Sequence, residues 1–218
     1  MVLIIEKYTG FAPFYDLLSG EAPVYRAGRR IGIRFLDLAE GAQVLDLGCG
    51  TGLNFGYLEE RIGTTGTIIG VDRSAEMLAQ ARRKATRNGW KNIILIQADA
   101  LSTSPESLRE AITSQGGQAL SDAALATYAL SLMDPWETGW TLLQQLTAPK
   151  GSLCVVDMQE PESRIPGIRT LARLACALGG ADITAHPWRA VEQDCDDVAS
   201  ESARSGHLQI RAGHRRSP

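Results

Sequence analysis

The stretch VLDLGCGTGLNFGYL, from Val44 to Leu58, places three closely spaced glycines between a short apolar run and a helix-like pattern. These glycines are Gly48, Gly50 and Gly52. In an open α/β sheet, ligands bind at the carboxyl ends of the strands, where the first turn leads into a helix. Glycine at such a turn lets the backbone adopt positive φ angles and approach a ligand closely. The stretch therefore predicts a strand, a ligand-binding turn and a helix.

Strand-like and helix-like segments alternate along the chain from this point. Short apolar runs, typical of buried parallel strands, occupy residues 43–48, 67–72, 92–99, 123–130 and 151–158. One predicted helix runs from the N-cap Ser74 to the C-cap pair Asn88-Gly89, and another begins at Pro135. This alternation predicts a doubly wound α/β sheet.

The C-terminal residues depart from the alternation. Two extended segments flank the Ser205-Gly206 pair, which is typical of a hairpin. Leu208 and Ile210 alternate with Gln209 and Arg211, so we expect a strand with one buried face and one exposed face. The sheet is therefore predicted to be mostly parallel and to finish with an antiparallel hairpin.

The composition is that of a soluble globular protein. The chain has 218 residues, of which 44% are hydrophobic and 22% are charged, with a formal net charge of -3. This charge argues against a dedicated nucleic-acid binder, which would carry a basic surface. We expect a single domain over residues 1–218, with a helical cap over residues 1–41 and a Rossmann-like core over residues 42–218.

The cysteines and the apolar runs indicate the compartment. Cys49, Cys154, Cys176 and Cys195 are widely separated and form no CxxC pair, which argues against a disulfide framework and a zinc site. The apolar runs are shorter than the roughly 20 residues of a membrane span. The opening MVLII is too short for a signal peptide. We expect a cytoplasmic protein without a transmembrane segment.

The charge beside the glycine turn narrows the class of ligand. The dinucleotide fingerprint is G-x-G-x-x-G, whereas this turn reads G-x-G-x-G, with Leu53 where the longer pattern has its last glycine. Asp46 precedes the first glycine by two residues. A carboxylate there would repel a pyrophosphate but would suit a cationic or amino-bearing ligand. A nucleoside that carries positive charge is therefore favoured over NAD.

Two further acids follow the next predicted strands. Asp72 closes the second run, about 20 residues past the turn, where an acid typically accepts from ribose hydroxyls. Asp99 closes the third run and could accept from an exocyclic amine. Each acid alone could equally be a helix N-cap or a solvated strand end. Three acids in register with one glycine turn favour a nucleoside site.

The motifs VLDLGCGTG, IIGVDRS, IQADAL and ATYALSL resemble, in this order, the successive motifs of class I S-adenosylmethionine-dependent methyltransferases. The resemblance covers about residues 8–158 well and the remainder more loosely. It implies a Rossmann-like sheet of seven strands with the last antiparallel. It also implies S-adenosyl-L-methionine as cofactor and S-adenosyl-L-homocysteine as product, without a metal.

The resemblance also implies which residues bind the cofactor. Asp46 and the glycines would face the methionine moiety, and Asp72 would bind the ribose hydroxyls. Asp99 and Ala100 would hold the adenine amino group. Arg73 would lie along the adenine and Tyr128 near the sulfonium, while Asn54 is the small polar residue and Tyr15 belongs to the lid. The full predicted set is Tyr15, Asp46, Gly48, Gly50, Gly52, Asn54, Asp72, Arg73, Asp99, Ala100 and Tyr128.

The opening YTGFAPFYDLLSGEAPVYRAGRR resembles two groups of this family, which methylate phospholipid head groups and quinone rings. In both groups, Tyr8 and Tyr15 would belong to a helical lid over the cofactor, although both could simply pack the cap onto the sheet. Arg26, Arg29 and Arg30 could meet an anionic head group or form a solvated helix face.

These observations predict a methyltransferase that acts on a small-molecule or lipid-like acceptor, either a phospholipid head group or a quinone-type ring. An aminocarboxypropyl transferase with the same cofactor, or a non-catalytic protein of the same fold, is the alternative. Nucleic acid is not expected as a partner, because TYAL replaces the Asn-Pro-Pro-aromatic motif of amino-methyltransferases. Peripheral contact of the protein with a membrane is left as an alternative.

Catalytic residues are not identifiable from the sequence. The three histidines show no metal-ligand spacing, which argues against a metal-dependent mechanism. His186 could be a base near the substrate or a helix cap. Cys49 lies inside the glycine turn, where a small side chain is needed, so we do not expect it to be a nucleophile.

Overall fold

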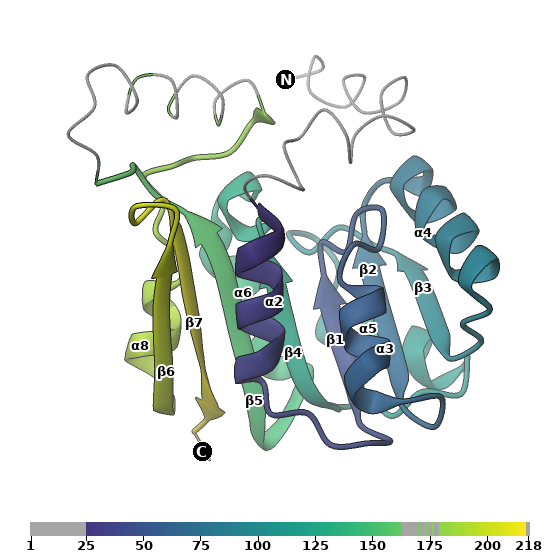
Figure 1. Ribbon diagram of the computed structural model, residues 1–218. Helices are drawn as coiled ribbons and strands as arrows, with labels where there is room; N and C mark the ends of the chain where they lie inside the picture. Colours follow the sequence, from purple (N-terminus) through teal and green to yellow (C-terminus); the bar gives the residue numbers. More distant parts are fainter. Residues whose placement is uncertain (1–24, 163–169, 171–172, 174–175, 177–178, 217–218) are drawn as a thin grey trace.

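Seven strands form one sheet in the order β3-β2-β1-β4-β5-β7-β6 in the computed structural model, which describes residues 25–162, 170, 173, 176 and 179–216 (Figure 1). β1 to β5 are parallel, whereas β7 is antiparallel to β5 and to β6. The predicted doubly wound sheet with a terminal hairpin is therefore confirmed. The strands are β1 (Gln43–Leu47), β2 (Thr67–Asp72), β3 (Ile93–Gln97), β4 (Ser121–Thr127), β5 (Thr147–Met158), β6 (Cys195–Ala203) and β7 (Leu208–Arg215).

Helices cover both faces of the sheet (Figure 1). One face packs against α2 (Arg26–Phe35), α3 (Phe55–Ile62) and α4 (Ala75–Asn88). The other face packs against α5 (Pro105–Thr113), α6 (Trp136–Gln145) and α8 (Arg189–Asp194), and a short 3-10 turn, η4 (Leu130–Leu132), follows β4. Among the helices that the described residues form, none is both long and apolar enough to span a bilayer.

The residues predicted to begin or end two of the helices do so in the structure. Ser74 caps α4, because its hydroxyl accepts a hydrogen bond from the Met77 amide at 3.2 Å. The same helix ends at Gly89, whose φ of 73° is left-handed. Pro135 precedes α6 as its N-cap residue. These local signals set where α4 and α6 begin and therefore how the preceding turns meet the edge of the sheet.

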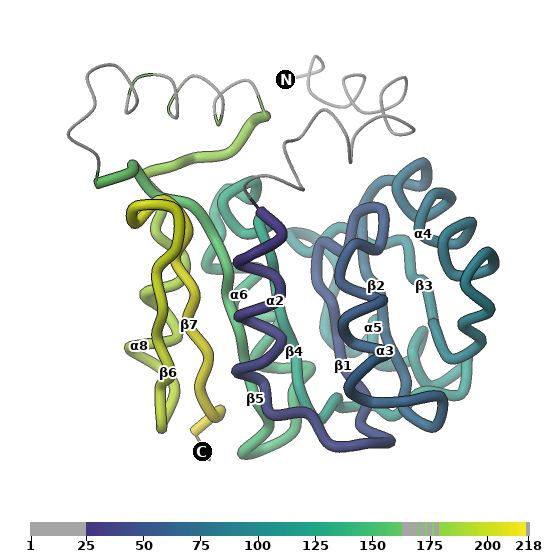
Figure 2. The backbone as a smooth tube through the Cα atoms, viewed as in Figure 1, coloured from purple at the N-terminus to yellow at the C-terminus, as the bar shows by residue number. Residues whose placement is uncertain are grey.

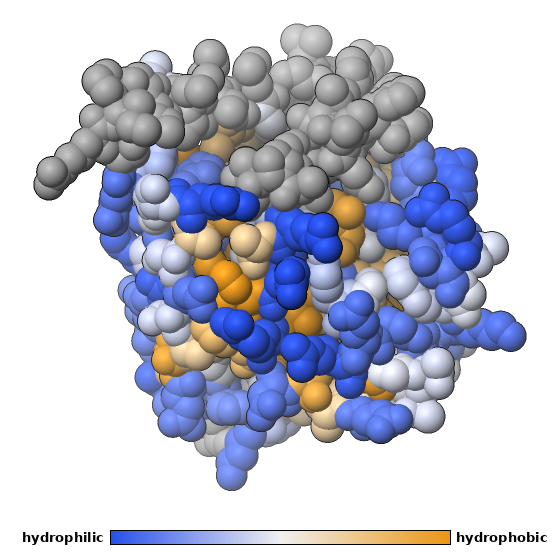
Figure 3. Space-filling view, in the orientation of Figure 1, coloured by the Kyte–Doolittle hydropathy of each residue, from blue (hydrophilic) through white to orange (hydrophobic). Residues whose placement is uncertain are grey.

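The central strands of the sheet, such as β1 and β4, are buried on both faces, as expected for strands between two helix layers. Every residue of β1 is buried, and Phe55 and Ile69 are fully enclosed on opposite sides of the sheet. The face shown in Figure 3 carries hydrophilic side chains over most of its area, with smaller apolar areas between them. The core therefore holds the carboxyl ends of the strands in a rigid row.

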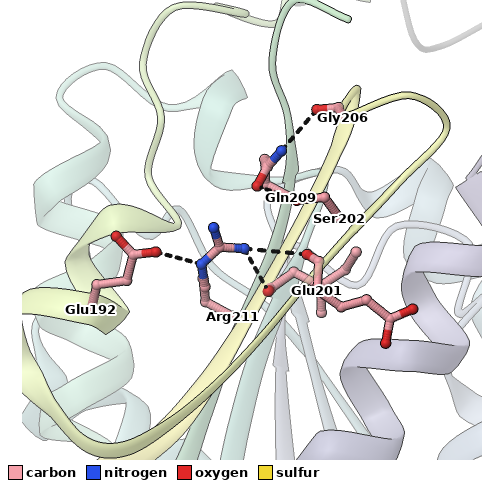
Figure 4. Close-up of polar contacts among 7 residues, drawn as sticks. Glu192, Glu201, Ser202, Gly206, Gln209 and Arg211 are labelled. Carbon is pink, nitrogen blue, oxygen red and sulfur yellow. Dashed lines mark hydrogen bonds and ion pairs between the residues drawn. The ribbon is translucent and has the colours of Figure 1, made fainter. Parts of the chain in front are cut away.

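The expected exposed face of β7 is wrong. Gln209 is 4% exposed, and the Arg211 side chain is 12% exposed. β7 lies between β5 and β6, and helices α2 and α8 pack on its two sides. Figure 4 shows Arg211 between Glu192 of α8, with which it forms an ion pair, and the Glu201 carbonyl of β6. The alternation therefore marks two buried faces, one of which is polar.

Part of the predicted cap lies outside the described residues. Tyr8 and Tyr15 belong to this part. The described part of the cap is α2, which packs closely on β5 and β7. The division of the chain into a cap and a core stays a prediction.

Candidate functional site

A cleft opens at the carboxyl ends of β1 to β4. It contains about 990 Å³ of empty space, with open solvent at its mouth included. Apolar side chains, among them Met77, Leu101 and Met133, form part of its wall. The predicted site residues that line it are Gly48, Gly50, Asp72, Arg73, Asp99, Ala100 and Tyr128.

The glycine turn follows β1 and forms one wall of the cleft. The Gly48 and Cys49 amides donate to the Val71 carbonyl at 2.8 and 3.0 Å, which holds the turn against β2. Gly48 has a φ of 70°, and a Cβ atom there would lie 2.5 Å from the Ala129 Cβ. Gly50 has a φ of 53°, but a Cβ there would meet no protein atom within 4 Å. A side chain at Gly50 would therefore project into open space beside the cleft.

Asp72 connects the glycine turn to the start of α4. Its two carboxylate oxygens accept hydrogen bonds from the Gly50 amide at 2.8 Å and the Ser74 amide at 2.9 Å. Burial raises the pKa of Asp72, and these two bonds lower it. Ser74, and not Asp72, is the N-cap of α4. The carboxylate is half-buried at the cleft wall, where it can accept further hydrogen bonds from a ligand.

Asp99 lies in the turn after β3, two residues beyond the end of the strand. One carboxylate oxygen accepts from the Leu101 amide at 2.9 Å. The Asp99 carbonyl accepts from the Ser102 and Thr103 amides at 3.1 and 2.9 Å. The turn therefore holds the Asp99 side chain in place at the cleft wall, beside the buried Ala100.

Asp46 lies behind the glycine turn and not on the cleft wall. It is 0% exposed within β1, and the Asn54 amide donates to both of its carboxylate oxygens at 3.0 Å. Burial raises the pKa of Asp46 to about 7, while the Asn54 bond and the Arg29 guanidinium lower it. Gly52, within the turn, and Asn54, just after it, are also not among the residues that line the cleft. These three predicted residues therefore support the cleft wall and do not line it.

Arg29 is a site residue that the sequence analysis did not assign to the cofactor. Its guanidinium lines the cleft, donates to Asn54 Oδ1 at 3.1 Å and to Thr127 Oγ1, and lies 5.0 Å from the centre of the Tyr128 ring. The pair Gly28 and Gly32, spaced by four, was the available signal. A Cβ at Gly28 would lie 2.2 Å from Tyr128 Oη. The glycines therefore let α2 approach the sheet closely enough for Arg29 to reach the cleft.

Tyr128 closes the β4 side of the cleft in a strained backbone conformation. Its φ is 56°, a region that a bulky residue rarely adopts. Its amide donates to the Val156 carbonyl at 2.7 Å, and its hydroxyl donates to the Tyr25 carbonyl at 2.8 Å. The Tyr25 and Tyr128 rings lie 4.8 Å apart. Backbone strain of this kind costs of the order of 1–3 kcal/mol and is common at functional sites.

Two other residues considered from the sequence are not placed as catalytic groups: His186 is not part of the cleft lining, and Cys49 is a buried residue of that lining. His186 does not cap α8, because Trp188 is the N-cap residue, and its ring packs 5.6 Å from the Trp188 ring. Cys49 is buried, and burial raises the pKa of its thiol well above the usual value. Within the described residues, no group of three or more His, Cys, Asp or Glu side chains is arranged to hold a metal ion.

The cleft combines three kinds of binding group. Asp72 and Asp99 supply acceptors for hydroxyl and amino groups, and Arg29 supplies a cation for a carboxylate. The apolar wall can cover a planar ring. This set suits an extended nucleoside with an amino-acid tail.

Comparisons with known proteins place these residues in a family context. Residues 44–135 match a family model described as a methyltransferase domain. The chain is 33% identical over 104 residues to a 2-phytyl-1,4-naphtoquinone methyltransferase from Thermosynechococcus vestitus, which covers 47% of this chain and 45% of that protein. It is 31% identical over 90 residues to a demethylmenaquinone methyltransferase from Shouchella clausii, with 40% and 38% covered. The chain thus spans less than half the length of these relatives.

The fold is also similar to solved structures. A SAM dependent methyltransferase from Aquifex aeolicus superimposes with a TM-score of 0.60 over 94% of this chain and 98% of that chain, at 15% identity. At this identity the similarity supports the fold alone.

Proposed function

The chain carries a class I S-adenosylmethionine-dependent methyltransferase domain, and we propose that it transfers a methyl group from S-adenosylmethionine to a small acceptor with a quinone-type ring. The observation that carries this proposal is the meeting of Gly50, Asp72, Asp99 and Arg29 in one cleft. The names of the relatives, which refer to naphthoquinone and menaquinone, support the class of acceptor.

The residues of the cleft fit each part of the cofactor. Asp72 would accept hydrogen bonds from the ribose hydroxyls, since the Gly50 and Ser74 amides hold its carboxylate at the wall. Asp99 would accept from the adenine amine beside Ala100, and Arg73 would lie along the adenine. A bound cofactor supplies a sulfonium, whose methyl group already has an activated leaving group.

The amino-acid end of the cofactor would lie at the β1 and β4 side of the cleft. Arg29 would pair with the carboxylate of the cofactor. The buried Asp46 would polarise Asn54, which hydrogen-bonds to it, and so favour the ammonium group of the cofactor on this side. Tyr128 would then stand near the sulfonium. The enzyme mainly has to hold the acceptor in line and exclude water.

The acceptor reacts in its reduced form in this proposal. A quinone ring carbon is electrophilic, whereas the ring carbon beside a hydroquinone hydroxyl is a nucleophile. A general base is then needed to remove the hydroxyl proton as the new bond forms.

The test is release of S-adenosylhomocysteine by the purified protein. Reduced naphthoquinones and benzoquinones, phospholipids, free nucleosides and tRNA would each be supplied as acceptor. We expect turnover with a hydroquinone and none with tRNA, and product analysis should show one added methyl group on the ring. Turnover with phospholipid or tRNA alone would replace the proposed acceptor, and transfer of an aminocarboxypropyl group would replace the reaction.

A further inference from the structure

We propose that His207, in the turn between β6 and β7, is the general base that takes the hydroxyl proton from the acceptor. This inference rests on the hydroquinone acceptor proposed above. Its grounds are the tautomer of the imidazole, the rigidity of the turn and the position of the turn beside the cleft.

The contacts of the imidazole fix which nitrogen is basic. His207 Nδ1 lies 2.6 Å from the carbonyl oxygen of Gln159. A carbonyl oxygen can only accept a hydrogen bond, so Nδ1 carries the proton and Nε2 carries the lone pair. A third group that orients the imidazole through Nδ1–H is the arrangement by which histidine bases act in other enzymes.

The turn that carries His207 is held firmly. The Gln159 amide donates to the His207 carbonyl at 2.9 Å, and the Glu162 amide donates to the Ser205 carbonyl at 2.8 Å. Figure 4 shows the buried Gln209 side chain reaching back to the Gly206 carbonyl, at 2.8 Å. The backbone of the turn is therefore held at His207, Ser205 and Gly206, and the imidazole is held through its Nδ1 contact with the Gln159 carbonyl.

The turn lies at the same edge of the sheet as the cleft. Figure 2 shows the β6–β7 turn beside the carboxyl end of β5, next to the strands whose ends form the cleft. Tyr128 lines the cleft on this side, and the Tyr25 ring, outside the cleft lining, contacts both the Tyr128 ring and the His207 ring. The Tyr25 ring centre is 4.8 Å from that of Tyr128 and 6.4 Å from that of His207.

This row of rings indicates where a planar acceptor lies. The proposed cofactor contacts extend from Asp99 and Asp72 to Arg29, so we place the acceptor on the β4 and β5 side of the cleft. A quinone-type ring packed along Tyr128 and Tyr25 would have its reacting carbon toward the cleft and a hydroxyl toward His207. The aromatic pair would therefore set the direction in which the acceptor faces the base.

Each proton and electron pair in the proposed reaction is accounted for. His207 Nε2 takes the hydroxyl proton while the ring carbon forms a bond to the methyl carbon. The carbon–sulfur bond breaks, and its electron pair stays on sulfur as a neutral thioether. The methylated ring carbon then loses its proton to water, and the imidazolium returns its proton to the ring oxygen. One proton is released in each turnover, and His207 ends neutral.

The experiment compares His207→Gln, His207→Ala and the matched control His186→Gln. A glutamine amide can donate to the Gln159 carbonyl but cannot take a proton, so it preserves the turn and removes the base. We expect kcat with a hydroquinone to fall by about 100-fold or more in both His207 variants. Affinity for S-adenosylhomocysteine, measured by calorimetry, should be unchanged. Added imidazole should restore turnover to His207→Ala, and His186→Gln should resemble the wild type.

The outcomes separate this inference from the proposed function. If the wild type turns over a hydroquinone and His207→Gln does so at the same rate, the role of His207 is overturned and the proposed function stands. A loss of turnover that imidazole does not restore in His207→Ala also overturns it, because a missing base can be replaced from solution whereas damaged packing cannot. A wild-type protein that binds the cofactor and methylates no hydroquinone overturns the acceptor, and this inference with it.

Discussion

At the residue scale, Asp72 joins the glycine turn to the nucleoside part of the proposed site. Its carboxylate already accepts from the Gly50 and Ser74 amides and still lies at the cleft wall. The Asp72→Ala substitution would leave ribose hydroxyls and the Gly50 amide unpaired, at a cost of about 1.5–3 kcal/mol. We expect affinity for S-adenosylhomocysteine to fall roughly 10- to 100-fold in calorimetry.

The exposed Asp197 is a suitable control for this substitution, since it is an aspartate of β6 outside the cleft. Asp197→Ala should leave cofactor affinity unchanged. Equal affinity in Asp72→Ala and the wild type would contradict the ribose contact and reduce Asp72 to a support for the turn.

Asp46 gives a residue-scale prediction of pH dependence. Its pKa is about 7 in the folded protein against an ordinary value of 3.8, so the folded state binds the proton more tightly than the unfolded state. The contribution of Asp46 to stability is therefore fully present below the ordinary value and is lost as pH rises through about 7. Without cofactor, we expect the free energy of unfolding to fall with pH across this window.

The Asp46→Asn variant isolates this effect in urea denaturation at several pH values. The decline with pH should be shallower than in the wild type. Some decline should remain, because burial also raises the pKa of Asp157 to about 6. Parallel curves for the two proteins would show that Asp46 does not titrate in this window.

At the element scale, α2 is the helix that brings a cation to the cleft. Gly28 faces Tyr128 so closely that a Cβ would lie 2.2 Å from its hydroxyl oxygen. Gly28→Ala should push α2 away from the sheet and destabilise the protein by about 1–3 kcal/mol through overpacking. Because Arg29 moves with the helix, affinity for S-adenosylhomocysteine should fall as well.

The exposed Arg30 of the same helix provides the comparison. Arg30→Ala should change neither stability in denaturant nor cofactor affinity. If Gly28→Ala loses stability and keeps its affinity, then the close approach of α2 serves packing and does not position Arg29 for the ligand.

At the scale of the whole molecule, the described sheet and its two helix layers bury a large apolar core on both faces of the sheet. We predict that deletion of residues 1–20 reduces turnover far more than it reduces thermal stability. The physical reason is that a lid over the cleft would exclude water and complete the acceptor site, while the buried contacts of the sheet remain. Turnover and thermal unfolding of the shortened protein provide the measurement. Full turnover without these residues would contradict the lid.

The sequence by itself determined the features that depend on local patterns. Ser74 and Gly89 set the ends of α4, because cap residues act on their own helix terminus. Gly48 and Gly50 marked the turn, because its φ angles are positive. Asp72 and Asp99 lie in the turns after parallel strands, whose carboxyl ends meet at one edge, so their places on the cleft wall followed from their order along the chain.

Only the tertiary structure decided which of the remaining polar residues face the cleft. Arg29 reaches the cleft because α2 packs closely on the sheet. Asp46 is buried behind Asn54 because β1 lies in the middle of the sheet, between the two helix layers. Gln209 is buried and Arg211 is half-buried for the same reason, since β6 and α8 pack against a strand whose alternation alone predicts exposure. A local pattern specifies the direction of a side chain, whereas its burial depends on segments far away in the sequence that pack against it.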